Sequence, residues 1–441
     1  MFQSPAPHLD AAKVAALADE MLDWKYQAVP AALQNQNVGD FLAGAPTLAQ
    51  LQTPVLVLDA QAMESNMRKF ASWCTAHGVL AAPHGKTTMS PALWQRQIDH
   101  GAWAITLANS HQLRVARAFG LSRIMIANTV TDPQAIAYLA QEILAGAEIY
   151  CWVDSVQAVE LLSAQLRNVP EAVLPLIVEL GGAGGRTGVR SLDGALEIAR
   201  AVKDSPQLRL TGVGGYEGAL AHTTDEAAIA AVRGYLSNIG ELHGLLQGED
   251  LYDTDQVILT AGGSAYFDDV ATVLARYVAE PSASGPAVRV VIRSGAYIVH
   301  DDGFYREISP LGRQFPDGPE SFTSAMHAWA RVASVPETGL AILDVGKRDV
   351  PFDEGLPTVQ CIAEGLGEPT RALAEARISA VNDQHAFMHF ARDEYVKPGD
   401  VIRLGLSHPC TAFDKWQLIP VLESTTATQN PVIVDLLRTF F

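Results

Sequence analysis

Eight short apolar runs, rich in β-branched residues, recur along the middle of the chain. They cover residues 79–83, 103–107, 124–127, 149–153, 174–180, 208–216, 256–261 and 288–293. The stretches between them have a helical composition and begin at candidate N-caps such as Asn109, Asp132, Ser155, Ser191 and Asp225. Strand and helix alternating eight times predict an α/β fold. We favour a (β/α)8 barrel of the TIM type, although a doubly wound open sheet has the same alternation.

After residue 295 the alternation stops. The remaining chain holds β-rich segments at 330–336, 340–345, 358–362, 376–382, 401–406 and 417–422, separated by Pro, Gly and Asp. Before the barrel lie a predicted helix at 11–23 and a predicted strand at 55–59 that leads into a helix. The predicted domains are an N-terminal helical extension at 1–52, a barrel at 53–295 and a mainly-β C-terminal domain at 296–441.

The composition and charge of the chain exclude some classes of function. The 441 residues are 48% apolar, enough for a sizeable core, and carry 31 Lys and Arg against 49 Asp and Glu, a formal net charge of −18. This charge argues against a nucleic-acid or anionic-membrane partner. No apolar run approaches bilayer-spanning length and the N-terminus has no signal-peptide pattern, so we expect a cytoplasmic protein. The four scattered cysteines indicate free thiols or a metal ligand rather than a disulfide framework.

Lys86 is the first candidate for chemistry. It follows the apolar run 79–83 after a Pro/Gly turn, which places its amine at the carboxyl end of a predicted strand. Active sites of (β/α)8 barrels are built from the loops after these strand ends. A lysine amine acts as a nucleophile or base where burial or neighbouring cations lower its pKa. We therefore predict that Lys86 is catalytic, rather than a solvated lysine beside a turn.

Two further motifs follow later strands. Gly262-Gly263-Ser264 precedes a helix that we expect from Ala265, and bare amides with a hydroxyl at a helix N-terminus suit a phosphate. Arg186 lies among five glycines, and its guanidinium can donate to a phenolate or carboxylate. A lysine, a phosphate-binding turn and an arginine at one end of a barrel indicate a single ligand, pyridoxal 5′-phosphate held by the lysine as a Schiff base.

The segment His408-Pro409-Cys410 offers an imidazole and a thiolate, the ligands that zinc prefers. On an extended segment, an i, i+2 spacing points both side chains the same way. Two ligands leave coordination positions open, which fits a catalytic ion better than a structural one. The alternative is an ordinary buried thiol beside a loop histidine. The segment by itself leaves both interpretations open.

Three motifs together resemble the D-serine dehydratase and D-threonine aldolase group. They are PHGKTT at 83–88, TPVLVLD at 53–59 and SHPC at 407–410. These proteins are fold-type III pyridoxal phosphate enzymes, whose barrel is similar to that of alanine racemase. The resemblance covers most of the chain from about residue 50 to 420, and amino-acid deaminases are the most similar branch.

The resemblance also implies roles for individual residues. The implied assignments are Lys86 as the Schiff-base lysine, Arg186 near the phenolic oxygen, Tyr216 near the pyridine nitrogen, Gly262, Gly263 and Ser264 on the phosphate, and His408 and Cys410 on Zn²⁺ or another divalent metal. We also expect His84, two residues before the lysine, to line the cofactor. Two stretches depart from the family pattern, Gly181-Gly182-Ala183 in place of Asp-x-Gly and Asp383-Gln384-His385-Ala386 in place of acidic-acidic-His-Gly. The family implies a homodimer.

The expected activity is that of a lyase on a small amino-acid substrate. We predict a pyridoxal phosphate- and zinc-dependent dehydratase, or deaminase, that converts D-serine, D-threonine or a similar D-β-hydroxy amino acid to a 2-oxo acid and ammonia. Within the resemblance a His-x-Cys pair is similar to the dehydratases and a His-x-Asp pair to the aldolases, so Cys410 favours dehydration. The alternative is retro-aldol cleavage to glycine and an aldehyde. A non-catalytic pyridoxal phosphate carrier is a third interpretation, although a carrier has no need of the β domain or the metal pair.

Overall fold

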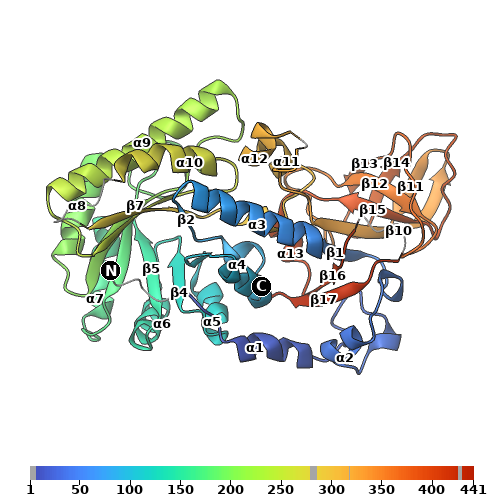
Figure 1. Cartoon of the computed structure of the whole chain (residues 1–441), viewed down its shortest axis with the longest axis horizontal. Helices are drawn as coiled ribbons and strands as arrows, with labels where there is room; N and C mark the ends of the chain where they lie inside the picture. The colour runs from blue at the N-terminus through green and yellow to red at the C-terminus, as the bar shows by residue number, and fades with distance from the viewer. Residues whose placement is uncertain (1–5, 279–285, 317, 426–429) are drawn as a thin grey trace. The chain divides into compact units, whose positions relative to one another are not determined.

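The structure is a computed structural model that describes residues 6–278, 286–316, 318–425 and 430–441. These residues form two compact units, each with its own sheet (Figure 1). The first unit contains residues 6–10, 71–86 and 94–295, and the second contains residues 11–70, 87–93 and 296–441.

The first unit contains an eight-stranded sheet in which every pair is parallel, in the order β2-β9-β8-β7-β6-β5-β4-β3. The strands are β2 (Leu80–Ala81), β3 (Ile105–Leu107), β4 (Arg123–Ile126), β5 (Glu148–Val153), β6 (Leu174–Glu179), β7 (Leu208–Gly214), β8 (Gln256–Ala261) and β9 (Ala287–Ile292). The two ends of the sheet are joined, because Trp103 N donates to Ala81 O and Thr106 N donates to Pro83 O. The predicted (β/α)8 barrel is confirmed.

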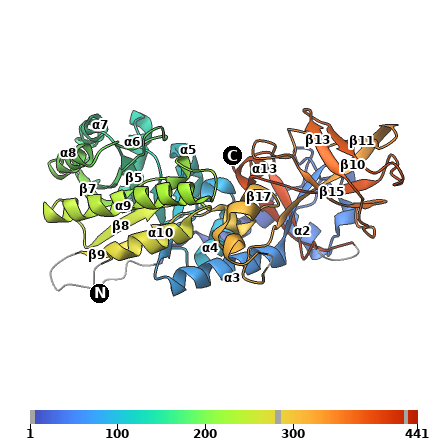
Figure 2. The ribbon, with the colours of Figure 1, turned by 90° about the horizontal axis from the view of Figure 1, so that it is seen from above.

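Helices alternate with the barrel strands along the chain and flank the sheet (Figures 1 and 2), and the first two of them lie partly in the second unit. They are α3 (Ala60–Ala76), α4 (Pro91–Asp99), α5 (Ser110–Ala118), α6 (Pro133–Leu144), α7 (Val156–Leu166), α8 (Leu192–Lys203), α9 (Glu226–Gly248) and α10 (Phe267–Leu274), with 3-10 turns η4 (Gly85–Thr87), η5 (Glu217–Ala219) and η6 (Ala275–Tyr277). The predicted caps Asn109, Asp132, Ser155, Ser191 and Asp225 each accept a backbone N–H of the first helical turn. None of the described helices combines the length and the hydropathy needed to cross a bilayer.

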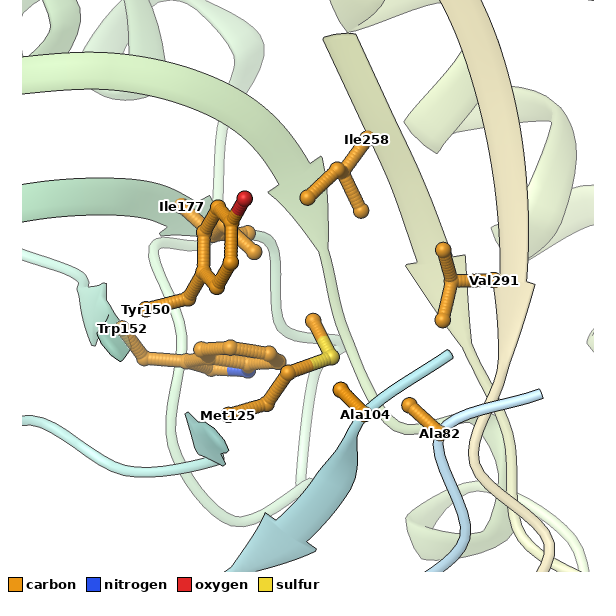
Figure 3. Packing of buried hydrophobic residues seen from close by; sticks show 8 residues of the cluster. All are labelled: Ala82, Ala104, Met125, Tyr150, Trp152, Ile177, Ile258 and Val291. Atoms are coloured by element: carbon orange, nitrogen blue, oxygen red, sulfur yellow. The ribbon is translucent and has the colours of Figure 1, made fainter. Parts of the chain in front are cut away.

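Side chains from five strands, together with two alanines next to strands, fill the barrel interior. Figure 3 shows them converging between the strands: Ala82, Ala104, Met125, Tyr150, Trp152, Ile177, Ile258 and Val291. All are at least nine-tenths buried. The interior is therefore a packed core, as in other barrels of this kind, and polar ligands must bind at a strand end.

The second unit contains a nine-stranded sheet that is antiparallel except for one pair. Its longest path runs β13-β14-β11-β10-β1-β16-β17, and β15 pairs with both β10 and β12. The strands are β1 (Val55–Asp59), β10 (Met326–Glu337), β11 (Leu340–Leu343), β12 (Thr358–Ala363), β13 (Arg377–Val381), β14 (Ala386–His389), β15 (Val401–Gly405), β16 (Leu418–Leu422) and β17 (Ile433–Arg438). The short helices of this unit are α1 (Ala11–Ala15), η1 (Ala16–Asp19), η2 (Ala31–Leu33), α2 (Val38–Ala43), η3 (Leu48–Gln50), η7 (Ala296–Ile298), α11 (Phe304–Ile308), α12 (Pro310–Gln314) and α13 (Pro409–Phe413).

Two predicted boundaries differ from the structure. Strand β1, expected within the barrel at 53–295, instead pairs with β10 and β16 of the second unit. The extension expected at 1–52 is not separate either, since residues 11–70 belong to the second unit, and the helix expected at 11–23 ends as a 3-10 turn at Asp19. An apolar run predicts a buried strand but not its partner, because register is set by residues far away in sequence.

Candidate active site

Lys86 lies in the 3-10 turn η4, just beyond the carboxyl end of β2. The turn is fixed by packing at Gly85, where an added Cβ would lie 2.4 Å from Ile105 Cγ2 and 2.7 Å from Trp94 Nε1. The indole of Trp94 also donates to Gly85 O at 3.1 Å. Glycine is therefore required immediately before the lysine. The Lys86 side chain is half-buried, and packing fixes the backbone turn that carries it.

Two of the other predicted residues, Lys86 and Arg186, lie near His84. Burial, followed by the positive charges of Lys86, Arg293 and Arg186, holds the pKa of the His84 imidazole well below its usual value. Its Nδ1 is buried and has no hydrogen-bond partner among the described residues. The three cations therefore lie close enough to act on one imidazole, which is neutral at physiological pH.

The glycine-rich loop that carries Arg186 is held by a residue that we did not predict. The guanidinium of Arg190 donates to four consecutive carbonyls, those of Gly185, Arg186, Thr187 and Gly188, at 2.7–3.0 Å. The Arg186 guanidinium lies 5.2 Å from the centre of the Tyr216 ring, in a cation–π contact. Arg186 and Tyr216, which the resemblance places near the phenolic oxygen and the pyridine nitrogen of the cofactor, are thus neighbours.

The Gly262-Gly263-Ser264 turn follows β8 and partly matches the prediction. Gly262 has φ +127°, a backbone conformation that glycine adopts freely. The amide of Gly263 is not bare, because it donates to Glu217 Oε1 at 3.0 Å, and Gly263 O accepts from Ser294 Oγ at 2.9 Å. Helix α10 begins at Phe267, two residues later than expected. The turn is therefore a supported concave backbone segment, and not the direct start of a helix.

Buried charged groups surround this end of the barrel. Arg293 is 2% exposed, donates to Thr260 Oγ1 at 2.5 Å and to Gly215 O at 2.6 Å, and retains a buried Nε without a partner among the described residues. Burial raises the pKa of both Glu179 and Glu217, each of which also has an Oε2 without a described partner.

These features allow a test of the predicted cofactor. Buried polar atoms without partners indicate a polar ligand, since such atoms are costly unless hydrogen-bonded. The cations Lys86, Arg186 and Arg293 suit an anionic ligand, and Gly262 has a positive φ and presents no side chain at the turn. The residues present therefore fit pyridoxal 5′-phosphate. Arg293 and Glu217 each follow a strand, and this position is the sequence signal for both of them, whereas Arg190 has no such signal.

The second unit holds the predicted metal pair. His408 has φ +53° and caps the short helix α13, so the pair does not lie on an extended segment as expected, because Pro409 starts a helical turn. The two side chains nevertheless converge: a hydrogen bond with Cys410, followed by one with Asp353, raises the pKa of His408 to about 9. An imidazole beside a thiol fits a zinc ion.

Asp353 is a member of this site that the sequence did not reveal. Its Oδ2 lies 2.6 Å from His408 Nδ1, and its Oδ1 accepts from Thr411 Oγ1 at 2.8 Å. Asp301 accepts from the backbone N of His408 at 3.1 Å. With Nδ1 donating to Asp353, Nε2 is the ring nitrogen of His408 that would bind a metal. Among the described residues no three or more His, Cys, Asp or Glu side chains are arranged as a complete metal site.

Cys410 contacts the residue that follows Lys86 in sequence. Its thiol lies 3.4 Å from the hydroxyl of Thr87, which belongs to the same unit and directly follows Lys86 in sequence. The candidate metal pair therefore contacts the residue next to the candidate catalytic lysine.

Known proteins are similar to this chain over part or most of its length. Residues 325–422 match the putative serine dehydratase domain. The D-threonine aldolase of Arthrobacter sp. is 27% identical over 368 residues, 83% of this chain and 88% of that protein. The D-threo-3-hydroxyaspartate dehydratase of Delftia sp. (strain HT23) is 31% identical over 169 residues, 38% of this chain and 44% of that protein.

Among solved structures, D-threonine aldolase from Filomicrobium marinum has the same fold, with a TM-score of 0.71 at 24% identity over 88% of this chain and 97% of that one. The relatives are enzymes, namely aldolases and a dehydratase that act on D-amino acids. These matches confirm the resemblance that the motifs indicated, to the D-serine dehydratase and D-threonine aldolase-like family with its alanine racemase-like fold.

Proposed function

We propose that this chain is a pyridoxal phosphate- and zinc-dependent dehydratase that converts a D-β-hydroxy amino acid to a 2-oxo acid and ammonia. The observation that carries the proposal is the contact of Cys410 with Thr87, the neighbour of Lys86. Through this contact, the thiol of the proposed metal pair lies beside the residue that directly follows Lys86 in sequence. The family to which the relatives belong supports the D configuration and the lyase class.

Each residue has a defined task in this proposal. Lys86 would attach the cofactor and then hold the proton taken from the substrate Cα at its Nζ. Arg186, stacked on Tyr216, would donate to an oxygen of the cofactor ring, and the turn at Gly262 would receive the phosphate. When bound, pyridoxal phosphate supplies an electron sink for the bond broken at Cα.

The metal pair decides the reaction type. His408 and Cys410 would hold a zinc ion, and Asp353 would keep the imidazole in the required orientation. When bound, such an ion supplies Lewis acidity toward a β-hydroxyl group. A hydroxyl that leaves as hydroxide gives dehydration, which yields the 2-oxo acid and ammonia after hydrolysis.

Retro-aldol cleavage is the second candidate. It is favoured by the relatives that match this chain over most of their length, which are a D-threonine aldolase and 3-hydroxy-D-aspartate aldolases. The pair His408 and Cys410 supports dehydration instead. Within the resemblance, a His-x-Cys pair is similar to the dehydratases and a His-x-Asp pair to the aldolases. Both reactions need Lys86 and the metal pair.

One assay separates the candidates. Purified protein with added cofactor and zinc is incubated with D-serine, D-threonine and 3-hydroxy-D-aspartate, with and without a chelator, and 2-oxo acid, ammonia and glycine are measured together. We expect 2-oxo acid and ammonia in equal amounts, no glycine, and loss of both products with chelator. Glycine as the main product would assign an aldolase, and retention of cofactor without any product would assign a carrier. The homodimer and the cytoplasmic location stay predictions.

A further inference from the structure

Two hydrogen-bond donors face each other in the sheet of the second unit, away from the residues discussed so far. Trp329 on β10 and Arg403 on β15 are direct partners in the antiparallel register. Directly opposed residues of an antiparallel pair project from the same face of the sheet. The indole and the guanidinium therefore emerge side by side.

Both side chains line a small cavity on this face. Leu48 of η3 and Leu422 at the end of β16 form part of its wall. The segment after β12 contributes Gly367, Glu368 and Thr370, and the connection from β16 to β17 contributes Thr425, Asn430 and Pro431. Asn430 closes the wall, because its N donates to Gly367 O at 2.7 Å and its Oδ1 accepts from Ala49 N at 3.1 Å. Hydrogen bonds therefore hold this wall of the cavity in place.

Two buried N–H groups at the cavity, one of Trp329 and one of Arg403, have no hydrogen-bond acceptor among the described residues. Trp329 is 5% exposed, and its buried Nε1 has no hydrogen-bond partner among the described residues. The Nε of the half-buried Arg403 is likewise buried and unpartnered, while its Nη1 donates to Thr425 O at 2.7 Å. Leaving a buried N–H unsatisfied is costly, and a guanidinium without a paired carboxylate costs more.

We propose that this cavity binds a small inorganic anion of halide size, held by Trp329 Nε1–H and Arg403 Nε–H. An anion accepts from both donors and balances the guanidinium charge, whereas a water molecule must also find acceptors for its own two hydrogens. The carbonyl of Thr425 accepts from Arg403 and Asn430 Oδ1 accepts from Ala49, so each of these two acceptors already has one donor. The exposed Glu368 is the one carboxylate among the cavity-lining residues, and its charge opposes the anion.

The direct test is crystallographic. Crystals of the full chain grown in sodium bromide are measured at the bromine absorption edge. We expect an anomalous peak within hydrogen-bond distance of both Trp329 Nε1 and Arg403 Nε. Ordinary water density at this position, without an anomalous peak, would overturn the proposal.

A solution experiment tests the same donors without crystals. The thermal midpoint is measured against sodium chloride, with sodium gluconate at equal ionic strength as reference, because a ligand that binds the folded state raises the midpoint by mass action. We expect a saturable rise specific to chloride in the native chain. In Trp329→Phe and Arg403→Gln the chloride concentration needed should increase about tenfold or more, since each variant removes one hydrogen bond to a charged group.

Two matched variants complete the design. Trp416→Phe removes an indole whose Nε1 already donates to Asp349 O at 2.8 Å in the same unit, so its chloride response should equal that of the native chain. Glu368→Gln should strengthen the response, because it removes the opposing charge. An equal response in Trp329→Phe, Arg403→Gln and the native chain would contradict the assignment, even if either variant is less stable, because the comparison is between two salts for each protein.

Discussion

At the scale of single residues, Lys86 and His408 depend on neighbours that fix their geometry. Lys86 starts from a turn in which Gly85 has no room for a side chain, beside the Trp94 indole. His408 is held at its backbone N by Asp301 and at its ring by Asp353. Catalytic groups held by such second contacts keep a productive geometry with little loss of entropy on binding.

The first prediction concerns Lys86→Ala. Without the amine, pyridoxal phosphate cannot be attached covalently, so the variant should lose the visible absorption band of the bound cofactor after dialysis and should have no turnover. Lys203→Ala, which removes an exposed lysine at the end of α8, is the control and should keep both properties. A persistent band in Lys86→Ala would move the attachment site to another lysine.

The second prediction concerns Asp353→Asn. The amide is a poorer acceptor for His408 Nδ1 than the carboxylate, so zinc affinity should fall by roughly 10- to 100-fold. Affinity is measured by competition with a chromophoric chelator, which does not depend on catalysis. Asp414→Asn changes an exposed carboxylate just after α13 and should bind zinc as the native chain does. Equal affinity in both variants would leave Asp353 as a purely structural residue.

At the scale of elements, the loops after the barrel strands carry the candidate site residues, while side chains of the strands pack in the barrel interior. The loop after β6 is held by Arg190, and the turn after β8 is held by Glu217 and Ser294. These supports are side-chain contacts to loop backbone, so the loops are formed before any ligand binds.

The third prediction tests the turn after β8. In Gly263→Val an added Cβ would lie 3.1 Å from Tyr216 Cε2, and overpacking of this kind costs about 1–3 kcal/mol. If the turn receives the phosphate, this cost should appear as a roughly 5- to 150-fold rise in the Kd for pyridoxal phosphate, measured by fluorescence titration. Gly244→Val on α9, where the Cβ meets nothing within 4 Å, is the control. An unchanged Kd in Gly263→Val would assign the phosphate to another loop.

At the scale of the whole molecule, two units share interleaved segments of one chain. The chain passes from the barrel unit to the β unit between Lys86 and Thr87. The β unit has its own sheet, and its packing contributes to the stability of the fold. One buried histidine, His300, makes this stability depend on pH.

The fourth prediction follows from that histidine. Burial, followed by the charges of Arg306 and Lys69, lowers the pKa of His300 to about 4, whereas in the unfolded chain it is about 6.5. Between these values the unfolded chain binds a proton that the folded chain does not, so stability falls as the pH falls from 6.5 to 4. The loss from this group reaches roughly 3 kcal/mol below pH 4.

The test uses His300→Asn, because His300 has φ +48° and asparagine tolerates this conformation without ionising. The thermal midpoint of the variant should rise relative to that of the native chain as the pH decreases from 7 to 4. His385→Asn, in the exposed turn between β13 and β14, should show no such trend. Parallel midpoint curves for His300→Asn and the native chain would refute the assignment.

The sequence by itself determined the features that arise from local patterns. The eight barrel strands, the caps such as Asn109 and Asp132, and the position of Lys86 after β2 follow from apolar runs, cap chemistry and turn residues within a few positions of one another. Motif resemblance added the similarity to the D-serine dehydratase and D-threonine aldolase group, and the comparisons confirm this resemblance.

Only the tertiary structure decided which distant groups meet. It placed β1 beside β10 and β16, Asp353 against His408 at a separation of 55 residues, and Cys410 against Thr87 at a separation of 323 residues. No periodicity links such positions, because pairing register and side-chain contact depend on how the complete chain packs. For the same physical reason, the cavity between Trp329 and Arg403 became visible only when both strands lay in register.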